Sequence, residues 1–401
     1  MTSNRSTSVI VVGAGATGRG HVAQLADESG YGLVFLDKDL GLCAALRSAG
    51  AYTVRLVSGY PRTVTVSGFK IFHTSHPGEF YQSFRDAPFI FTAVGPGNIR
   101  DAATYMRPLF TRWLNETWSE TGPRGFKNVF CCENMNHSST AFRDILLEGL
   151  GPDIRTALAN RVGFADTMVA RVVAKPTDPL SLLGEEYSEW TADRTALRGP
   201  DVPSIRSLEL VENQTRYLQR KLYIHNTGHA TIGYLGFLRG YTWIHEAAQD
   251  PDIMEICEKA IEESGWAIER EYGFGADVIR TYRTALTEKC VSPELPDEIL
   301  RVVREPARKL GPEERFLGPA GLMLKHGRQP DYLLYGVSAA LLSRIPGDSQ
   351  AERIADLLAA RGPSCLEEIS ASRVPAAVLA RVEALFPVVR KRFARSSAKS
   401  S

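Results

Sequence analysis

The ten residues 221–230, KLYIHNTGHA, combine an amine, an amide and two imidazoles in one short segment. On a helical wheel at about 100° per residue, Lys221, Asn226 and His229 share one broad face, and His225 falls within it. The three apolar residues that follow Lys221 favour its neutral amine, which is the form that accepts a proton as a general base. The amide of Asn226 can donate a hydrogen bond to an oxyanion. The alternative is a solvated lysine beside packed histidine and asparagine side chains.

A second chemical pattern lies at the N-terminus, where Gly13, Gly15 and Gly18 form a G-x-G-x-x-G motif. It follows an apolar run typical of a buried strand and precedes a helical pattern, and Asp37 ends the next apolar run. In this context the glycines permit a tight turn, a close approach of the pyrophosphate and close packing of helix on strand. Asp37 would accept hydrogen bonds from the adenosine ribose and repel a 2′-phosphate, which predicts NAD rather than NADP, although Lys38 weakens that preference. The alternative is a glycine-rich turn without a ligand.

Two later apolar runs, in 87–97 and 127–135, end in residues that we expect at the same edge of the sheet. Glu133 and Asn134 are polar groups placed where the nicotinamide should lie, although Glu133 can instead be a loop cap or a surface charge. The predicted cofactor-binding residues are Gly13, Gly15, Ala16, Thr17, Gly18, Arg19, Asp37, Thr92, Ala93, Val94, Gly95 and Glu133.

The elements that must position these residues alternate between short apolar runs and helical patterns. This alternation predicts an α/β fold with a Rossmann-type, doubly wound parallel sheet. Residues 52–73 alternate with the period of a strand and predict a small antiparallel insertion. After residues 199–203 helical periodicity dominates, and 250–273 has the acidic start and glycine stop of a long amphipathic helix.

This change from alternating strand and helix patterns to helical patterns predicts two domains, followed by a tail. We expect an NAD-binding Rossmann domain at 1–200 and a mostly helical substrate and catalytic domain at 201–390. The basic, serine-rich end, 391–401, reads as a disordered tail.

Composition limits the possible partners. The chain has 401 residues, 44% hydrophobic and 23% charged, with a net charge of +1, which offers no electrostatic case for nucleic acid or a membrane surface. No apolar run approaches the roughly 18 residues that span a bilayer, and the polar N-terminus does not read as a signal peptide. None of the six cysteines forms a C-x-x-C pair, so we expect no metal site and reduced thiols in a cytoplasmic protein. We expect the protein to be a monomer or a homodimer.

The spacing K-x-x-x-x-N-x-x-H of Lys221, Asn226 and His229, together with the glycine motif, resembles the polyol-specific long-chain dehydrogenases. The pieces TAVGP, CENM, SEW, EESG, YGF and ARKL occur in that family's order, and the likeness is greatest to its members that act on mannitol 1-phosphate. The resemblance implies a catalytic base at Lys221, oxyanion-stabilising amides at Asn226 and Asn134, and a substrate-orienting imidazole at His229. It implies reversible, metal-independent hydride transfer between NAD and a polyol phosphate, with mannitol 1-phosphate and fructose 6-phosphate as the expected pair.

A phosphorylated substrate requires fixed cations, and Arg304, Arg308 and Lys309 in VVREPARKLG are the candidates. The alternative for these three residues is a basic surface turn. Other functions also remain open: a dehydrogenase of a free polyol, a uronate or a cyclitol, or a non-catalytic, NAD-binding regulatory protein.

The sequence departs from the family pattern at two places. The family commonly has an aspartate before the arginine that follows the sixth strand, whereas Ala170 precedes Arg171 here. Acidic residues often stand two or three positions before the catalytic lysine, where this chain has Gln219 and Leu218. A missing carboxylate at either place could alter the proton exit route or the substrate preference.

Overall fold

The computed structural model describes residues 7–57, 60–118, 125–135, 137–174, 177–294 and 296–394. The chain forms two compact units, Met1–Leu218 and Gln219–Ser401. The first unit extends past residue 200 because strand β11 (Leu208–Val211) pairs with β10 (Trp190–Asp193).

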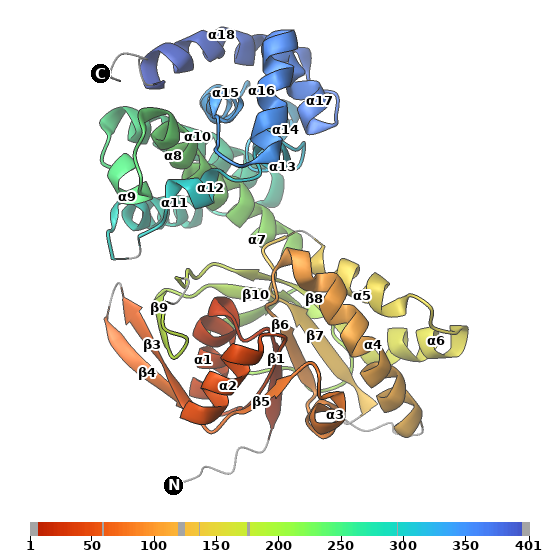
Figure 1. Cartoon of the computed structure of the whole chain (residues 1–401). Coiled ribbons are helices and arrows are strands. Elements are labelled where there is room, and N and C mark those ends of the chain that lie inside the picture. Colours follow the sequence, from red (N-terminus) through yellow and green to blue (C-terminus); the bar gives the residue numbers. More distant parts are fainter. Residues whose placement is uncertain are drawn as a thin grey trace. The chain divides into compact units, whose positions relative to one another are not determined.

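Unit 1 contains, within its described residues, an eight-stranded sheet in the order β11-β10-β8-β7-β6-β1-β2-β5 (Figure 1). The remaining strands are β1 (Ser8–Val12), β2 (Gly32–Asp37), β5 (Lys70–His73), β6 (Phe89–Thr92), β7 (Lys127–Cys131) and β8 (Val162–Val169). The neighbours from β5 through β8 are parallel, and β10 is antiparallel to β8. The predicted Rossmann-type sheet is therefore confirmed, and the strand ends that carry the predicted cofactor residues lie along one edge.

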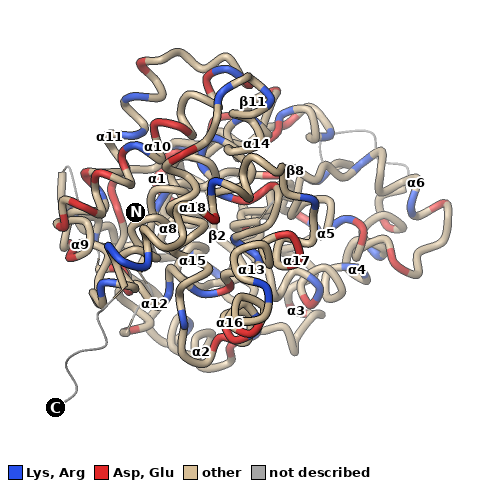
Figure 2. Tube along the Cα trace, turned by 90° about the horizontal axis from the view of Figure 1, so that it is seen from above, with Lys and Arg blue, Asp and Glu red and all other residues tan. Residues whose placement is uncertain are grey.

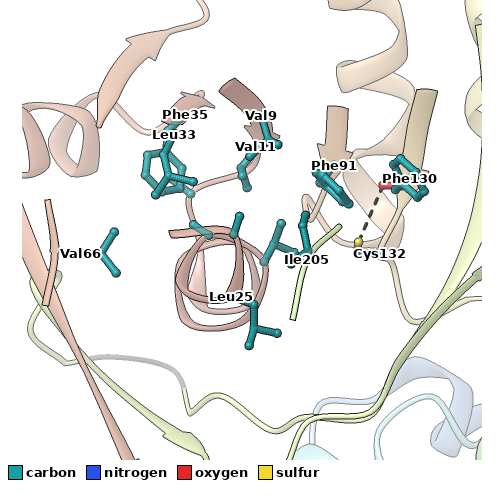
Figure 3. Packing of buried hydrophobic residues seen from close by; sticks show 14 of the residues in the cluster. Val9, Val11, Leu25, Leu33, Phe35, Val66, Phe91, Phe130, Cys132 and Ile205 are labelled. Atoms are coloured by element: carbon teal, nitrogen blue, oxygen red, sulfur yellow. Dashed lines mark hydrogen bonds between the residues drawn. The ribbon is translucent and has the colours of Figure 1, made fainter. Parts of the chain in front are cut away.

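Both faces of this sheet are buried, as the apolar runs predict. Val9 and Val11 of β1 belong to one hydrophobic cluster, whereas Ile10 and Val12 belong to the other. Figure 3 shows residues of the first cluster, with Val9, Val11, Leu33, Phe35, Phe91 and Phe130 from the strands and Leu25 from the adjacent helix. The helical elements of unit 1 are η1 (Gly18–Ala23), α1 (Gln24–Glu28), α2 (Leu40–Ala49), α3 (Pro77–Asp86), η2 (Pro96–Asn98), α4 (Ile99–Glu116), α5 (Ser138–Leu147), α6 (Pro152–Arg161), η4 (Arg194–Ala196) and α7 (Gln214–Arg220), whose last residues fall in unit 2.

The predicted antiparallel insertion is correct for only part of its length. β3 (Ala51–Val57) and β4 (Arg62–Ser67) form an antiparallel pair, and β9 (Ser181–Glu185) joins β3 in parallel to complete a second sheet. The end of the predicted segment, residues 70–73, is instead β5 of the main sheet. It pairs with β2 because Ile71 can then be buried in the core of that sheet.

Unit 2 is built from helices in its described residues, as predicted. They are η5 (Lys221–His225), α8 (Asn226–Arg239), α9 (Ile244–Ala247), α10 (Pro251–Tyr272), α11 (Ala276–Val291), α12 (Ile299–Val303), α13 (Pro306–Lys309), α14 (Leu317–Lys325), α15 (Leu333–Leu342), α16 (Ser349–Arg361), η6 (Gly362–Cys365), α17 (Leu366–Ser370) and α18 (Ala376–Phe393). The predicted long helix is α10, which begins after an Asp250 cap and ends at Gly273 with φ 67°. The expected tail is partly helical, because 391–393 belong to α18, and residues 395–401 lie outside the described residues.

Helix α8 contacts α10, α12 and α15 and forms the centre of unit 2. Gly228 allows this close packing, since a Cβ at this position would lie 2.6 Å from Leu286 and 2.8 Å from Ile261. Figure 2 shows that both Lys and Arg and Asp and Glu are scattered over the trace, in keeping with the small net charge. None of the helices described by the structure is both long and apolar enough to cross a membrane.

Candidate active site

The glycine-rich loop joins β1 to a helix whose first turns include the π-helical element η1. Gly13 has φ 94°, and a Cβ there would lie 2.6 Å from the carbonyl oxygen of Ala93. A Cβ on Gly18 would lie 1.9 Å from the carbonyl oxygen of Gly13, so this glycine closes the loop on itself. By contrast, no atom lies within 4 Å of the Cβ position of Gly15. The loop therefore has two glycines required by packing and one that borders open space.

The accessible part of this loop consists of Gly15, Ala16 and Thr17, which are partly exposed at the start of the helix. Backbone N–H groups at a helix start are unpaired within the helix and suit an anion such as a pyrophosphate. These three predicted residues are therefore presented at the surface.

Asp37, at the end of β2, holds the loop from the neighbouring strand. Its Oδ2 accepts a hydrogen bond of 2.6 Å from the backbone N–H of Ala14, and its Oδ1 accepts one of 2.8 Å from that of Asp39. Lys38 turns to other partners, donating to Asn98 Oδ1 at 2.7 Å and lying 3.2 Å from the Asp101 carboxylate. The carboxylate of Asp37 is therefore the charged group that borders the loop, because the Lys38 amine is bound to other side chains.

Glu133 connects the ends of β6 and β7. Its buried carboxylate accepts hydrogen bonds from the Thr92 hydroxyl at 2.7 Å and the Val94 N–H at 3.0 Å. Burial raises the pKa of Glu133, and these two donors oppose that effect. The position supports the loop-cap alternative for Glu133, which shapes the partly exposed backbone of Ala93, Val94 and Gly95. Asn134 is exposed directly after it.

Arg19 lies beneath the loop, which differs from its predicted place beside a cofactor. The side chain is 1% exposed, and it donates from Nε to the Ala14 carbonyl at 2.5 Å and from the guanidinium to the Pro179 carbonyl. Burial lowers the pKa of Arg19. The guanidinium is thus used to support the loop from inside the protein.

The segment KLYIHNTGHA is helical, but it begins with the π-helical turn η5 rather than a regular α-turn. The backbone N–H of Asn226 donates a hydrogen bond to the carbonyl of Lys221, five residues earlier. Around the helix axis, Lys221 and Asn226 therefore lie closer together than a wheel at about 100° per residue predicts. Lys221, Asn226 and His229 are all partly exposed, as is His225. The intervening Leu222, Tyr223, Ile224, Thr227 and Gly228 are buried. The structure therefore brings the predicted amine, amide and imidazole to the accessible side of one helix.

Two charged residues near this segment were not identified from the sequence. Asp297 Oδ2 lies 3.1 Å from Nε2 of His229, and Lys289 contributes to lowering the pKa of His225, after burial as the main cause. Burial likewise lowers the pKa of His229, whereas Asp297 opposes this change. The only local signal for Asp297 was its spacing of four residues from Arg301, which is ordinary for a surface ion pair.

Comparison with protein-family models identifies this arrangement of domains. The model of the mannitol dehydrogenase Rossmann domain matches residues 7–204, and that of the mannitol dehydrogenase C-terminal domain matches residues 213–391. The chain belongs to the mannitol dehydrogenase family. It is therefore an oxidoreductase of a family of polyol dehydrogenases.

Two solved structures share the fold of this mannitol dehydrogenase family member. The first, Pseudomonas fluorescens mannitol 2-dehydrogenase in a ternary complex with NAD and D-mannitol, is 15% identical with a TM-score of 0.74, covering 96% of this chain and 92% of that one. The second, a D-sorbitol dehydrogenase in substrate-free form, is 13% identical with a TM-score of 0.77, covering 98% and 95% of the two chains. At these identities the likeness concerns the fold of the whole chain.

The three cations predicted to bind a phosphate in this family member do not form one accessible cluster. Lys309 is 5% exposed, its Nζ donates to the Val302 carbonyl, and burial lowers its pKa to about 7. Arg308 is exposed but pairs with Glu305 at 2.8 Å and Glu314 at 3.1 Å. Arg304 is exposed and has no ion pair within the part of the chain that the structure describes. Arg304 is thus the most available of the three.

The two departures from the family pattern have structural counterparts. The buried Arg171 guanidinium, next to Ala170, donates to the side-chain oxygen of Gln24 at 2.5 Å and to the Gly20 carbonyl at 3.2 Å. Gln219 accepts a hydrogen bond from the hydroxyl of Tyr272. Among the described residues, no group of three or more His, Cys, Asp or Glu side chains is placed to hold a metal ion.

Proposed function

We propose that this protein is an NAD-dependent, metal-independent dehydrogenase that interconverts mannitol 1-phosphate and fructose 6-phosphate. The observation that carries the proposal is the accessible face formed by Lys221, Asn226 and His229 on η5 and α8. An amine, an amide and an imidazole are the groups needed to remove an alcohol proton, stabilise an alkoxide and orient a polyol. Membership of the mannitol dehydrogenase family supports this assignment.

The glycine-rich loop fits a dinucleotide. The open space beside Gly15 admits a close approach to the backbone, and the helix start at Ala16 and Thr17 suits the pyrophosphate. The Asp37 carboxylate borders the loop, where it can accept hydrogen bonds from ribose hydroxyls. Bound NAD would supply the hydride acceptor for oxidation and, as NADH, the hydride donor for reduction.

The residues of unit 2 supply the proton transfer and the orientation. In oxidation Lys221 accepts the proton of the secondary hydroxyl, and in reduction it returns a proton to the carbonyl oxygen. The amide of Asn226 donates a hydrogen bond to the developing alkoxide, and His229 binds an adjacent hydroxyl. The role expected for Asn134 as a second amide donor rests on the family resemblance.

The first test concerns the cofactor. We expect NAD to be preferred over NADP by about 10- to 100-fold in kcat/KM, on the order of 1–3 kcal/mol, because Asp37 repels a 2′-phosphate. Asp37→Asn should narrow this gap, since the amide oxygen can still accept from Ala14 N–H but carries no charge. The exposed Asp153→Asn of the same unit serves as the control and should leave the ratio unchanged. Equal efficiency of the wild type with both cofactors would contradict the assignment.

A free polyol is the second candidate substrate, and one observation favours it. Lys309 is buried and Arg308 is paired with two glutamates, so only Arg304 of the predicted phosphate-binding residues is available. A free polyol needs hydrogen-bonding groups but no such cation.

The substrate test compares mannitol 1-phosphate with mannitol by following NADH absorbance. If Arg304 binds the phosphate, Arg304→Gln should raise KM for the phosphorylated polyol about 10- to 100-fold and leave KM for mannitol unchanged, since a hydrogen bond to a charged group contributes roughly 1.5–3 kcal/mol. Arg344→Gln, at another exposed arginine of unit 2, is the control. Equal losses on both substrates, or a wild type that prefers mannitol, would favour the free polyol.

A further inference from the structure

The side chain of His229 is held by a carboxylate from a distant part of unit 2. Its Nε2 lies 3.1 Å from Oδ2 of Asp297, and the two side chains are 21% and 18% exposed. His229 belongs to α8, whereas Asp297 lies directly before α12, so the contact joins two helices. Arg301 binds both oxygens of the same carboxylate, donating from Nε to Oδ1 at 2.6 Å and from Nη2 to Oδ2, the oxygen that His229 contacts.

The backbone around Asp297 is fixed as well. The Asp297 carbonyl accepts a hydrogen bond of 2.9 Å from the N–H of Ile244, and the N–H of Ile299 donates to the Thr242 carbonyl at 2.9 Å. Asp297 is therefore held by its main chain and by Arg301 before it contacts His229. Such a residue can impose one orientation on an imidazole at little entropic cost.

The chemistry of this contact selects a tautomer. An ionised carboxylate only accepts hydrogen bonds, so a neutral His229 must carry its proton on Nε2, and Nδ1 keeps the lone pair. Burial raises the pKa of Asp297, but the bonds with His229 and Arg301 hold this pKa below its usual value. The side chain is therefore ionised.

We propose that Asp297 is a positioning residue for the polyol reaction, which holds His229 as the Nε2–H tautomer and so presents Nδ1 as a hydrogen-bond acceptor to a substrate hydroxyl. This inference rests on the proposed function and adds a residue that acts through His229. According to this proposal, the preference for polyols that have a hydroxyl next to the reacting carbon depends on Asp297.

A purely structural alternative is that Asp297 pairs with Arg301 to stabilise the start of α12. The two explanations differ in how Asp297→Ala, which removes both carboxylate oxygens, combines with His229→Gln. If Asp297 acts through His229, kcat/KM should fall about tenfold or more in the single Asp297→Ala variant and change little in the His229→Gln background. A structural role predicts equal losses in both backgrounds.

A second measurement reads the tautomer directly. In full-length protein with 15N-labelled histidine, the His229 signal among the eight histidines is assigned by its loss in His229→Gln. We expect the Nε2–H tautomer in the wild type, a shift toward Nδ1–H in Asp297→Ala, and retention of the wild-type form in Asp297→Glu. Asp277→Ala, at an exposed aspartate paired with Arg280, is the matched control.

The outcomes separate this inference from the proposed function. Additive losses in the double variant, or an unchanged tautomer in Asp297→Ala, would overturn the positioning role even if the enzyme oxidises polyols. A wild type without polyol dehydrogenase activity would remove the proposed function, and with it the role of Asp297 in that reaction. The tautomer measurement would then still decide whether Asp297 holds His229.

Discussion

Replacement of Lys221 by alanine is expected to lower kcat about 10²- to 10⁴-fold, which corresponds to a loss on the order of 3–6 kcal/mol of transition-state stabilisation. The amine is the only group on the accessible face of 221–229 that we assign to proton removal, so its loss should affect the chemical step. NADH affinity should change little, because a general base acts on the alcohol rather than on cofactor binding. Steady-state kinetics and NADH fluorescence titration measure the two quantities separately.

Two further variants sharpen this result. Lys391→Ala, at an exposed lysine of α18, should leave kcat unchanged. Small primary amines should partly restore turnover to Lys221→Ala by replacing the missing base, whereas they should not restore Asn226→Ala. A near-normal kcat in Lys221→Ala would make the segment a packing element. It would favour the reading of the protein as a non-catalytic, NAD-binding regulator.

The second large effect is expected in the glycine-rich loop, where two glycines should respond differently to the same substitution. Gly18→Ala places a Cβ 1.9 Å from the Gly13 carbonyl oxygen, so backbone must move. We expect the free energy of unfolding to fall by about 1–3 kcal/mol or more, together with NADH affinity. Gly15→Ala meets no atom within 4 Å and should keep the stability of the wild type. It should still weaken NADH binding about 10- to 100-fold, because the methyl group obstructs the pyrophosphate.

Denaturant unfolding and NADH titration of the two variants provide the measurement. Gly78→Ala is the control, since this exposed glycine of α3 has open space around its Cβ position and lies outside the segments predicted to bind the cofactor. If Gly15→Ala binds NADH like the wild type, the loop does not carry the pyrophosphate. A stable Gly18→Ala protein would show that the close contact with Gly13 can relax.

The parts of the fold that local sequence predicts are those whose signals lie within a few residues. Apolar runs ending in Gly13 and Asp37 predicted β1, β2 and the loop between them, because buried parallel strands are apolar on both faces. The acidic start and glycine stop predicted α10 in the same way. Pairing between distant strands has no such signal. Residues 70–73 therefore read as part of the insertion, although burial of Ile71 places them in the main sheet.

In the candidate site, the sequence alone determined which residues share the helix of Lys221, since the spacing of Asn226 and His229 already puts them on one face. Only the tertiary structure decided their surroundings. The π-helical turn at Lys221 depends on packing. Lys309 is buried, with its amine bonded to a backbone carbonyl. Asp297 contacts His229 although the two residues are sixty-eight positions apart in the chain. The physical reason is that side-chain type and periodicity are local properties. Burial, ion pairing and the tautomer of a histidine depend on which distant segments the fold brings together.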